Sequence, residues 1–167
     1  ETLGQGGSLD VDAVALIVEH GDYPLNEFGQ VLYPRYEYFR EVLKVFEKAG
    51  KSVPVFVDKH LSYDHKHAAE MVATSKKLGF PLMAGSSVSV TFRRPALDPP
   101  LGVEMESALA VGGGWVADGG IFHILETLQA FAERRKGGEK GVRAVQLLKG
   151  QAAWKAAEDG LWSKELL

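Results

Sequence analysis

The chain has 167 residues, of which 46% are hydrophobic and 25% are charged, and its formal net charge is −3. This composition is typical of one globular domain with an apolar core, and it argues against a disordered chain. So weak and acidic a charge gives no general attraction for nucleic acid, and the lack of cysteine excludes disulfides, thiolate metal sites and cysteine nucleophiles. No apolar run approaches the roughly 18–20 residues that cross a bilayer, and no signal peptide is seen, so we expect a cytoplasmic protein without membrane contacts.

Three short apolar runs predict strands. They are residues 11–18, 53–57 and 80–84. Apolar side chains at helical spacing predict helices over 34–49 and 63–78 between them. This alternation predicts an α/β fold with a Rossmann-like parallel sheet and flanking helices, in a minimal or incomplete form.

Local signals refine the ends of these elements. Gly50 and Gly79 are placed to end the two helices, and Ser62 is a candidate N-cap of the second. Pro54 indicates an edge strand or the beginning of a strand.

The remainder of the chain divides less clearly. We expect residues 1–92 to form the Rossmann-like half and residues 93–167 a C-terminal segment packed on it as one unit. This segment is predicted to hold a helix over 121–135, a strand over 142–148 and a short helix in the tail. A further strand over 88–92 is also compatible with the pattern.

Polar residues follow each of the three predicted strands. Ligands bind beyond the carboxyl ends of the strands in open parallel sheets, so these residues are expected to meet at one rim. The alternative is that they only cap the helices that follow. The residues are Glu19, His20 and Asp22, then Asp58, Lys59 and His60, then Ser86.

These residue types can carry acid–base chemistry. His20 and His60 can serve as acid, base or metal ligand, and Lys59 can exchange a proton in a partly desolvated rim. Neighbouring carboxylates favour the charged lysine, so two effects oppose each other and the sequence does not decide between them. His123 and Glu126 lie three residues apart on one helix face, which indicates either a catalytic histidine with an orienting acid or a surface pair. The chain has neither a G-x-G-x-x-G fingerprint nor a Walker loop.

Two stretches resemble the Gfo/Idh/MocA oxidoreductases. The first leads from Gly50-Lys51-Ser52-Val53 to Asp58-Lys59-His60, which stands where that family has Glu-Lys-Pro. The second leads from Gly112-Gly113-Gly114-Trp115 through Asp118 to His123 and Glu126, and is similar to the family's Asp-x-Gly-x-His-x-x-Asp segment. The likeness covers about the second half of the Rossmann domain and the segment after it, as in a divergent bacterial branch.

The resemblance implies an oxidoreductase that acts on a sugar, cyclitol or similar polyhydroxylated molecule with NAD or NADP. Lys59, His123 and Asp58 would be catalytic, and Lys59 and Ser86 would contact the cofactor. The substrate would be bound by Glu19, His20, Asp22, His60, Ser86 and Glu126. A missing N-terminal half or a homo-oligomer would then complete the protein, because the family's first βαβ unit is not in this sequence and the chain lacks an initiator methionine.

Two alternatives remain open. A hydrolase, lyase or isomerase could use Glu19, His20, Asp58 and His60, with His123 as a further candidate. It could work with or without a divalent metal, because mixed histidine and carboxylate ligands suit zinc, manganese or iron. A non-catalytic sugar-binding module would keep the sheet without the chemistry.

Overall fold

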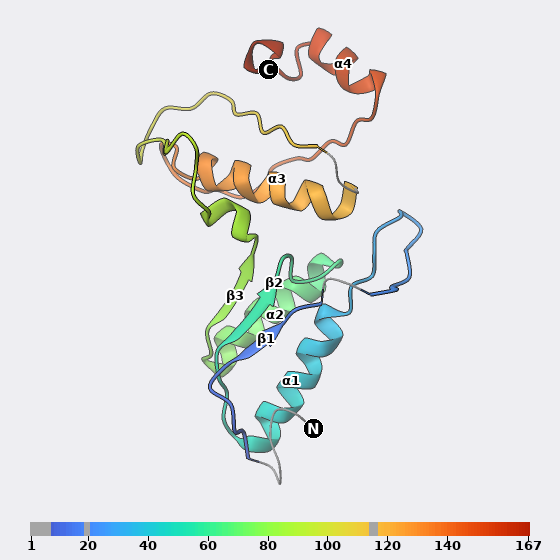
Figure 1. Ribbon diagram of the computed structural model, residues 1–167, viewed down its shortest axis with the longest axis vertical. Helices are drawn as coiled ribbons and strands as arrows, with labels where there is room; N and C mark the ends of the chain where they lie inside the picture. Colours follow the sequence, from blue (N-terminus) through green and yellow to red (C-terminus); the bar gives the residue numbers. More distant parts are fainter. Residues whose placement is uncertain (1–7, 19–20, 114–116) are drawn as a thin grey trace.

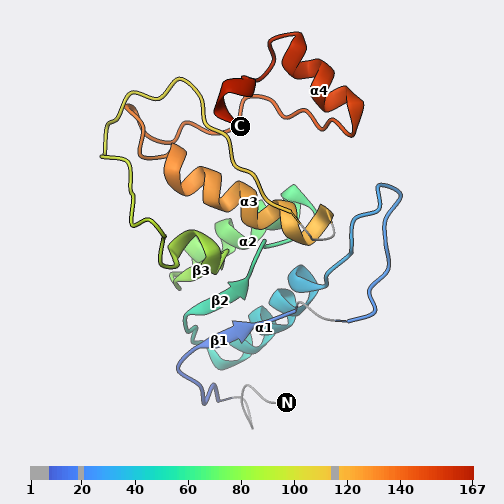
Figure 2. The ribbon, with the colours of Figure 1, turned by 45° about the horizontal axis from the view of Figure 1, so that its top comes forward.

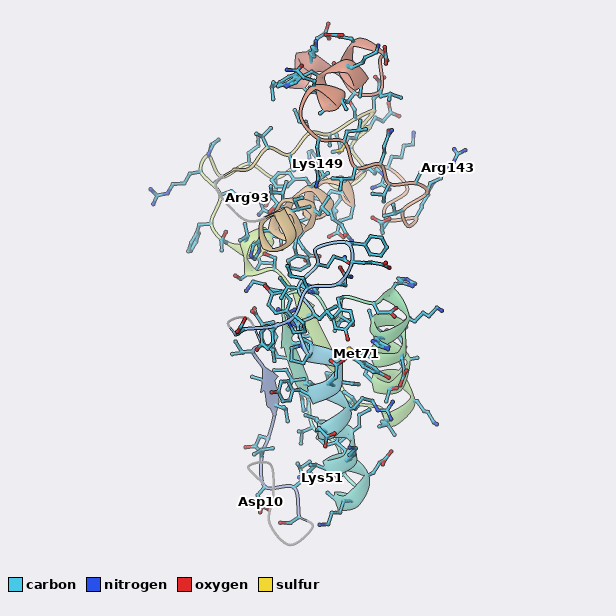
Figure 3. The ribbon with its side chains drawn as sticks, turned by 90° about the vertical axis from the view of Figure 1, so that its right-hand side faces the viewer. Asp10, Lys51, Met71, Arg93, Arg143 and Lys149 are labelled. Carbon is cyan, nitrogen blue, oxygen red and sulfur yellow. The ribbon has the colours of Figure 1, made fainter. Side chains whose placement is uncertain are left out.

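A computed structural model describes residues 8–18, 21–113 and 117–167. Its sheet has three parallel strands in the order β1 (Val14–Leu16), β2 (Val55–Asp58) and β3 (Leu82–Gly85). The helices α1 (Arg35–Ala49) and α2 (His65–Leu78) connect these strands and lie on the same face of the sheet (Figures 1 and 3). The prediction of an α/β fold with a parallel sheet and flanking helices is confirmed, and the arrangement is compatible with a minimal Rossmann-like fold.

The core lies between this sheet and the two helices. Val14, Val55 and Val57 point toward the helices and are buried, while Phe39 of α1 and Met71 of α2 fill the space opposite them. Met71 is labelled in Figure 3, among the side chains of the lower part of the molecule. The core therefore uses alternate strand positions and one stripe of each helix, as amphipathic elements require.

The other face of the sheet carries apolar side chains in one register row. Ala15 is aligned with Phe56, and Phe56 with Met83. Phe56 is 37% exposed and Met83 is 67% exposed, so no described residue covers this row fully. Parallel sheets are usually covered on both faces, which makes this open face unusual.

The ends of the first elements show which local signals operate. Gly50 and Gly79 cap α1 and α2 in the left-handed conformation, as predicted. The N-cap of α2 is Asp64, whose carboxylate accepts the backbone N–H of Lys66, so the assignment of Ser62 was wrong. Pro54 directly precedes β2, which is the central strand, so Pro54 marks a strand beginning and not an edge.

The second half of the chain contains helices and extended segments. Residues Ser87–Val90 form the short 3-10 helix η1 where a strand was compatible with the sequence. The helix α3 (Ala117–Ala132) begins and ends earlier than predicted, and α4 (Gln151–Glu158) and η2 (Lys164–Leu166) follow it. None of the described helices is both long and apolar enough to cross a membrane.

The strand predicted over 142–148 is absent from the structure. This segment has no regular secondary structure, and Val142, Val145 and Leu147 are between 71% and 86% exposed. Its apolar and β-branched composition favours an extended backbone, but a strand also needs a neighbour for its hydrogen bonds. No described strand lies against it.

The helix α3 lies beyond the carboxyl ends of the strands, beside η1 (Figures 1 and 2). Two hydrogen bonds hold the segment before α3 along the end of this helix. The side chain of Arg134 donates to the carbonyl oxygen of Pro99, and the backbone carbonyl of Arg134 accepts the N–H of Gly102. The edge of the sheet where parallel folds bind ligands is thus faced by α3.

Candidate acid–base site at the sheet edge

The first part of the site is the backbone at the end of β2. Lys59 has φ of 61°, and it is the one non-glycine residue of the described chain with a positive φ. Its carbonyl oxygen accepts the N–H of Gly85 at 3.0 Å, in a bridge that continues the pairing of β2 with β3. Left-handed conformations are unfavourable for residues with a Cβ atom, and such residues concentrate at functional sites.

The side chain of Lys59 is mostly buried. It is 13% exposed, and its Nζ atom lies 3.0 Å from Oδ2 of Asp58, which is 25% exposed. The carboxylate stabilises the ammonium form, whereas burial disfavours it. Within this ion pair Lys59 is suited to donate a hydrogen bond to a developing negative charge.

The second part of the site is Ser86, directly after β3, and it is 6% exposed. Its Oγ atom lies 2.5 Å from Nδ1 of His123 and accepts the backbone N–H of Val88 at 3.1 Å. Its own backbone N–H donates to Oε2 of Glu126 at 3.2 Å. Ser86 therefore connects the end of β3 to two side chains of α3.

A glycine is required beside this contact. Gly85 has φ of 136°, and a Cβ atom there would lie 3.0 Å from Oε2 of Glu126. The backbone of β3 can approach the carboxylate of Glu126 because residue 85 has no side chain. Glu126 thus holds the backbone at Ser86, a contact that the spacing of His123 and Glu126 did not reveal.

His60 belongs to a neighbouring, partly buried cluster. Its Nε2 atom lies 3.0 Å from NH1 of Arg35, and the guanidinium of Arg35 sits 4.4 Å from the ring centre of Tyr33. A guanidinium only donates hydrogen bonds, so Nε2 accepts and the ring proton of His60 lies on Nδ1. The ring of His60 also meets Phe122 of α3 at 5.6 Å between centroids, which places this cluster against the helix that carries His123.

Sequence reasoning missed Arg35, which is fully buried. No motif or spacing distinguishes it, because an arginine in the first turn of a helix is ordinarily solvated. Arg35 is singled out by its contact with His60, a residue that lies 25 positions further along the chain.

The structure places the remaining predicted residues as follows. Glu19 and His20 lie outside the described residues, and Asp22 is an exposed residue of the loop that leads to α1. His67 is partly buried, and its ring stacks on the ring of Tyr36 with 3.9 Å between centroids.

A pocket of about 250 Å³ opens beside His123. Two of its wall residues, Val88 and Ile121, are 43% and 41% exposed, so the pocket communicates with solvent. Its described lining consists of Val88, Gly112, Gly113, Gly120, Ile121, His123 and Ile124.

The helix termini next to the sheet do not fit the pyrophosphate of a dinucleotide. Such a group binds at a glycine-rich helix N-terminus through free backbone N–H groups. At α1, Pro34 precedes the helix and the N–H of Arg35 donates to the carbonyl of Tyr33. At α2, the carboxylate of Asp64 already occupies the N-terminus and would repel a phosphate.

Metal ligands and relatives give no further assignment. No group of three or more histidine, aspartate or glutamate side chains that could hold a metal ion occurs in the described part of the chain. Comparison with known proteins found no similar family model, curated protein or solved structure.

Proposed function

We propose that this chain is an enzyme that moves a proton to or from a hydroxyl group of a sugar, cyclitol or similar small molecule. The observation that supports it best is the junction at Ser86. The carbonyl oxygen of Lys59 accepts the N–H of Gly85, and the next residue, Ser86, contacts His123 of α3 through its Oγ atom. Such a reaction needs an acid–base group held by rigid elements beside a pocket, and His123 lines the pocket while Lys59 lies at the adjoining strand end.

The two groups have complementary roles in this proposal. With the ring proton of His123 on Nδ1 and directed to Ser86 Oγ, the Nε2 atom of His123 accepts the hydroxyl proton as the O–H bond breaks. The ammonium of Lys59, which is paired with Asp58, donates a hydrogen bond to the oxygen that becomes negative.

Oxidation of the hydroxyl is the reaction class that the likeness to the Gfo/Idh/MocA oxidoreductases implies. It also requires that a hydride leave the carbon for a nicotinamide. The N-termini of α1 and α2 do not fit the dinucleotide in the usual manner. The proposal therefore concerns the proton transfer that the residues of this chain perform.

The test combines a binding screen with matched variants. Sugars and cyclitols are screened with NAD, NADP and their reduced forms by thermal shift, because a ligand that binds the native state raises its stability. Compounds that bind are then assayed for turnover with the wild type and with Lys59→Ala and His123→Asn.

Each variant should lower kcat by about 10²–10⁴-fold, the usual contribution of a positioned acid or base. Lys44→Ala is the matched control, because Lys44 is an exposed lysine of α1 that pairs with Glu41 on the same helix. A binding compound that Lys59→Ala turns over as fast as the wild type would refute the proposal. If a compound binds but no turnover occurs in the wild type, the chain is a binding module instead.

A further inference from the structure

We infer that the pocket beside His123 binds a compact apolar group, an aromatic ring or a branched alkyl group, carried by the same molecule whose hydroxyl reacts. This inference rests on the proposed function, and it narrows the substrate from a polyol in general to an amphiphilic alcohol. Three observations on the pocket support it.

The first observation is its lining. Apart from His123, the described lining residues are aliphatic or glycine. Among the described lining residues His123 is the one with a polar side chain, so most hydroxyls of a polyol buried there would find no side-chain partner, and burying an unpaired hydroxyl is costly. An apolar group loses nothing and removes apolar surface from water.

The second observation is its size. A cavity of about 150 Å³ in an engineered protein holds benzene. The pocket beside His123 has about 250 Å³, which is enough for one ring with a short substituent. Because His123 forms part of the wall, a hydroxyl on that substituent would lie near the acid–base site.

The third observation concerns the glycines that make the space. At Gly112 a Cβ atom would lie 2.5 Å from Cδ1 of Ile124, so packing accounts for that glycine. At Gly113 no atom of the described residues beyond its chain neighbours lies within 4 Å of an added Cβ, and its φ is not in the left-handed region. Among the described residues, neither a left-handed φ nor packing explains glycine at position 113, and the lack of a side chain there leaves space beside the pocket.

The methyl groups of the isoleucines report directly on binding in the pocket. The chain has three, of which Ile121 and Ile124 line the pocket, while Ile17 lies just after β1. Benzyl alcohol is titrated into protein labelled at the isoleucine δ1 methyl groups, and the ring current of a bound aromatic group shifts nearby methyl signals. We expect saturable shifts of Ile121 and Ile124, an unchanged Ile17, and no shifts with inositol at the same concentration.

Matched variants locate the binding. Val88→Trp should fill the pocket and raise the Kd for benzyl alcohol at least tenfold. Val90→Trp places the same side chain two residues away on η1, at a position that is 82% exposed, and should leave Kd unchanged. An unchanged Kd in Val88→Trp, or equal shifts of all three isoleucines, would overturn the inference.

A third variant separates this inference from the proposed function. Lys59→Met should keep the Kd for benzyl alcohol within twofold, while it lowers kcat for the compounds that the wild type turns over by about 10²–10⁴-fold. Loss of benzyl alcohol binding in Lys59→Met would overturn the separate apolar pocket. Retained turnover in Lys59→Met, with the pocket still binding the ring, would refute the acid–base role and leave the pocket intact.

Discussion

The left-handed backbone of Lys59 leads to a stability prediction that the protein itself can calibrate. Replacing Lys59 by alanine or by glycine removes the same ammonium and the same ion pair with Asp58. The two variants differ in the cost of φ 61°, which is roughly 1–2 kcal/mol for a residue with a Cβ atom and is absent for glycine. Glycine also gains about 0.4–1 kcal/mol of entropy in the unfolded chain, which offsets part of this advantage. We expect Lys59→Gly to be more stable than Lys59→Ala by about 0.5–1 kcal/mol.

Gly50 supplies the matched control. It has the same φ of 61° at the C-cap of α1, and nothing lies within 4 Å of an added Cβ atom. We therefore expect Gly50→Ala to lower the free energy of unfolding by about the difference in this free energy between Lys59→Gly and Lys59→Ala. Urea unfolding followed by circular dichroism measures both differences, provided that the m-values agree among the variants.

The results have clear alternatives. Suppose that Gly50→Ala loses stability as expected, but that Lys59→Ala is as stable as Lys59→Gly or more stable. Residue 59 is then not held in the left-handed conformation. In thermal unfolding the expected difference corresponds to a Tm shift of about 1–4 °C for a chain of this size.

Three further outcomes are expected. Ser86→Ala removes the hydrogen bond that orients His123, which is worth about 1–1.5 kcal/mol. This variant should lower kcat by roughly tenfold and leave KM nearly unchanged. A change in KM alone would contradict the positioning role of Ser86. Met71→Ala should lower the free energy of unfolding by about 2–5 kcal/mol in urea titrations, because Met71 is fully buried, and a loss below 1 kcal/mol would show that the core closes around the gap. The hydrogen bond to Glu37, aided by burial and the charges of Glu37 and Asp64, raises the pKa of Tyr63 above its usual value of about 10. The unfolded chain then loses this proton first, so the stability that Tyr63 provides is present below pH 10 and is lost as pH rises further; Tyr63→Phe should remove that part of the alkaline pH dependence in unfolding titrations.

The first half of the fold was predictable because its signals are local. Short apolar runs, helical spacing and the two capping glycines each depend on neighbouring residues, and they define β1 to β3 with α1 and α2. Cap assignment failed by two residues because Ser62 and Asp64 are both good capping residues. Which one caps α2 depends on where the chain turns into the helix.

Predictions that depend on a distant partner were less successful. Residues 142–148 have the composition of a strand but no described strand pairs with them. The polar residues at the strand ends marked Lys59 and Ser86 as site candidates. The contact of Ser86 with His123, 37 residues away, could not be predicted, because it depends on where α3 docks. Arg35 gave no signal for the same reason.

The charges around the junction bear on the kind of molecule that the site accepts. Two carboxylates, Asp58 and Glu126, lie beside it, and the ammonium of Lys59 is paired with the first. Arg35 is fully buried against His60 and is not accessible to a ligand. Among the described residues at this junction, a phosphate or carboxylate of a substrate would meet these two carboxylates, and the ammonium of Lys59 is already paired with Asp58. A neutral alcohol carries no charge that the carboxylates repel, and in the proposed reaction its hydroxyl donates to His123 and accepts from Lys59. The electrostatics and the apolar pocket thus favour the same class of substrate, an uncharged hydroxyl compound with an apolar substituent.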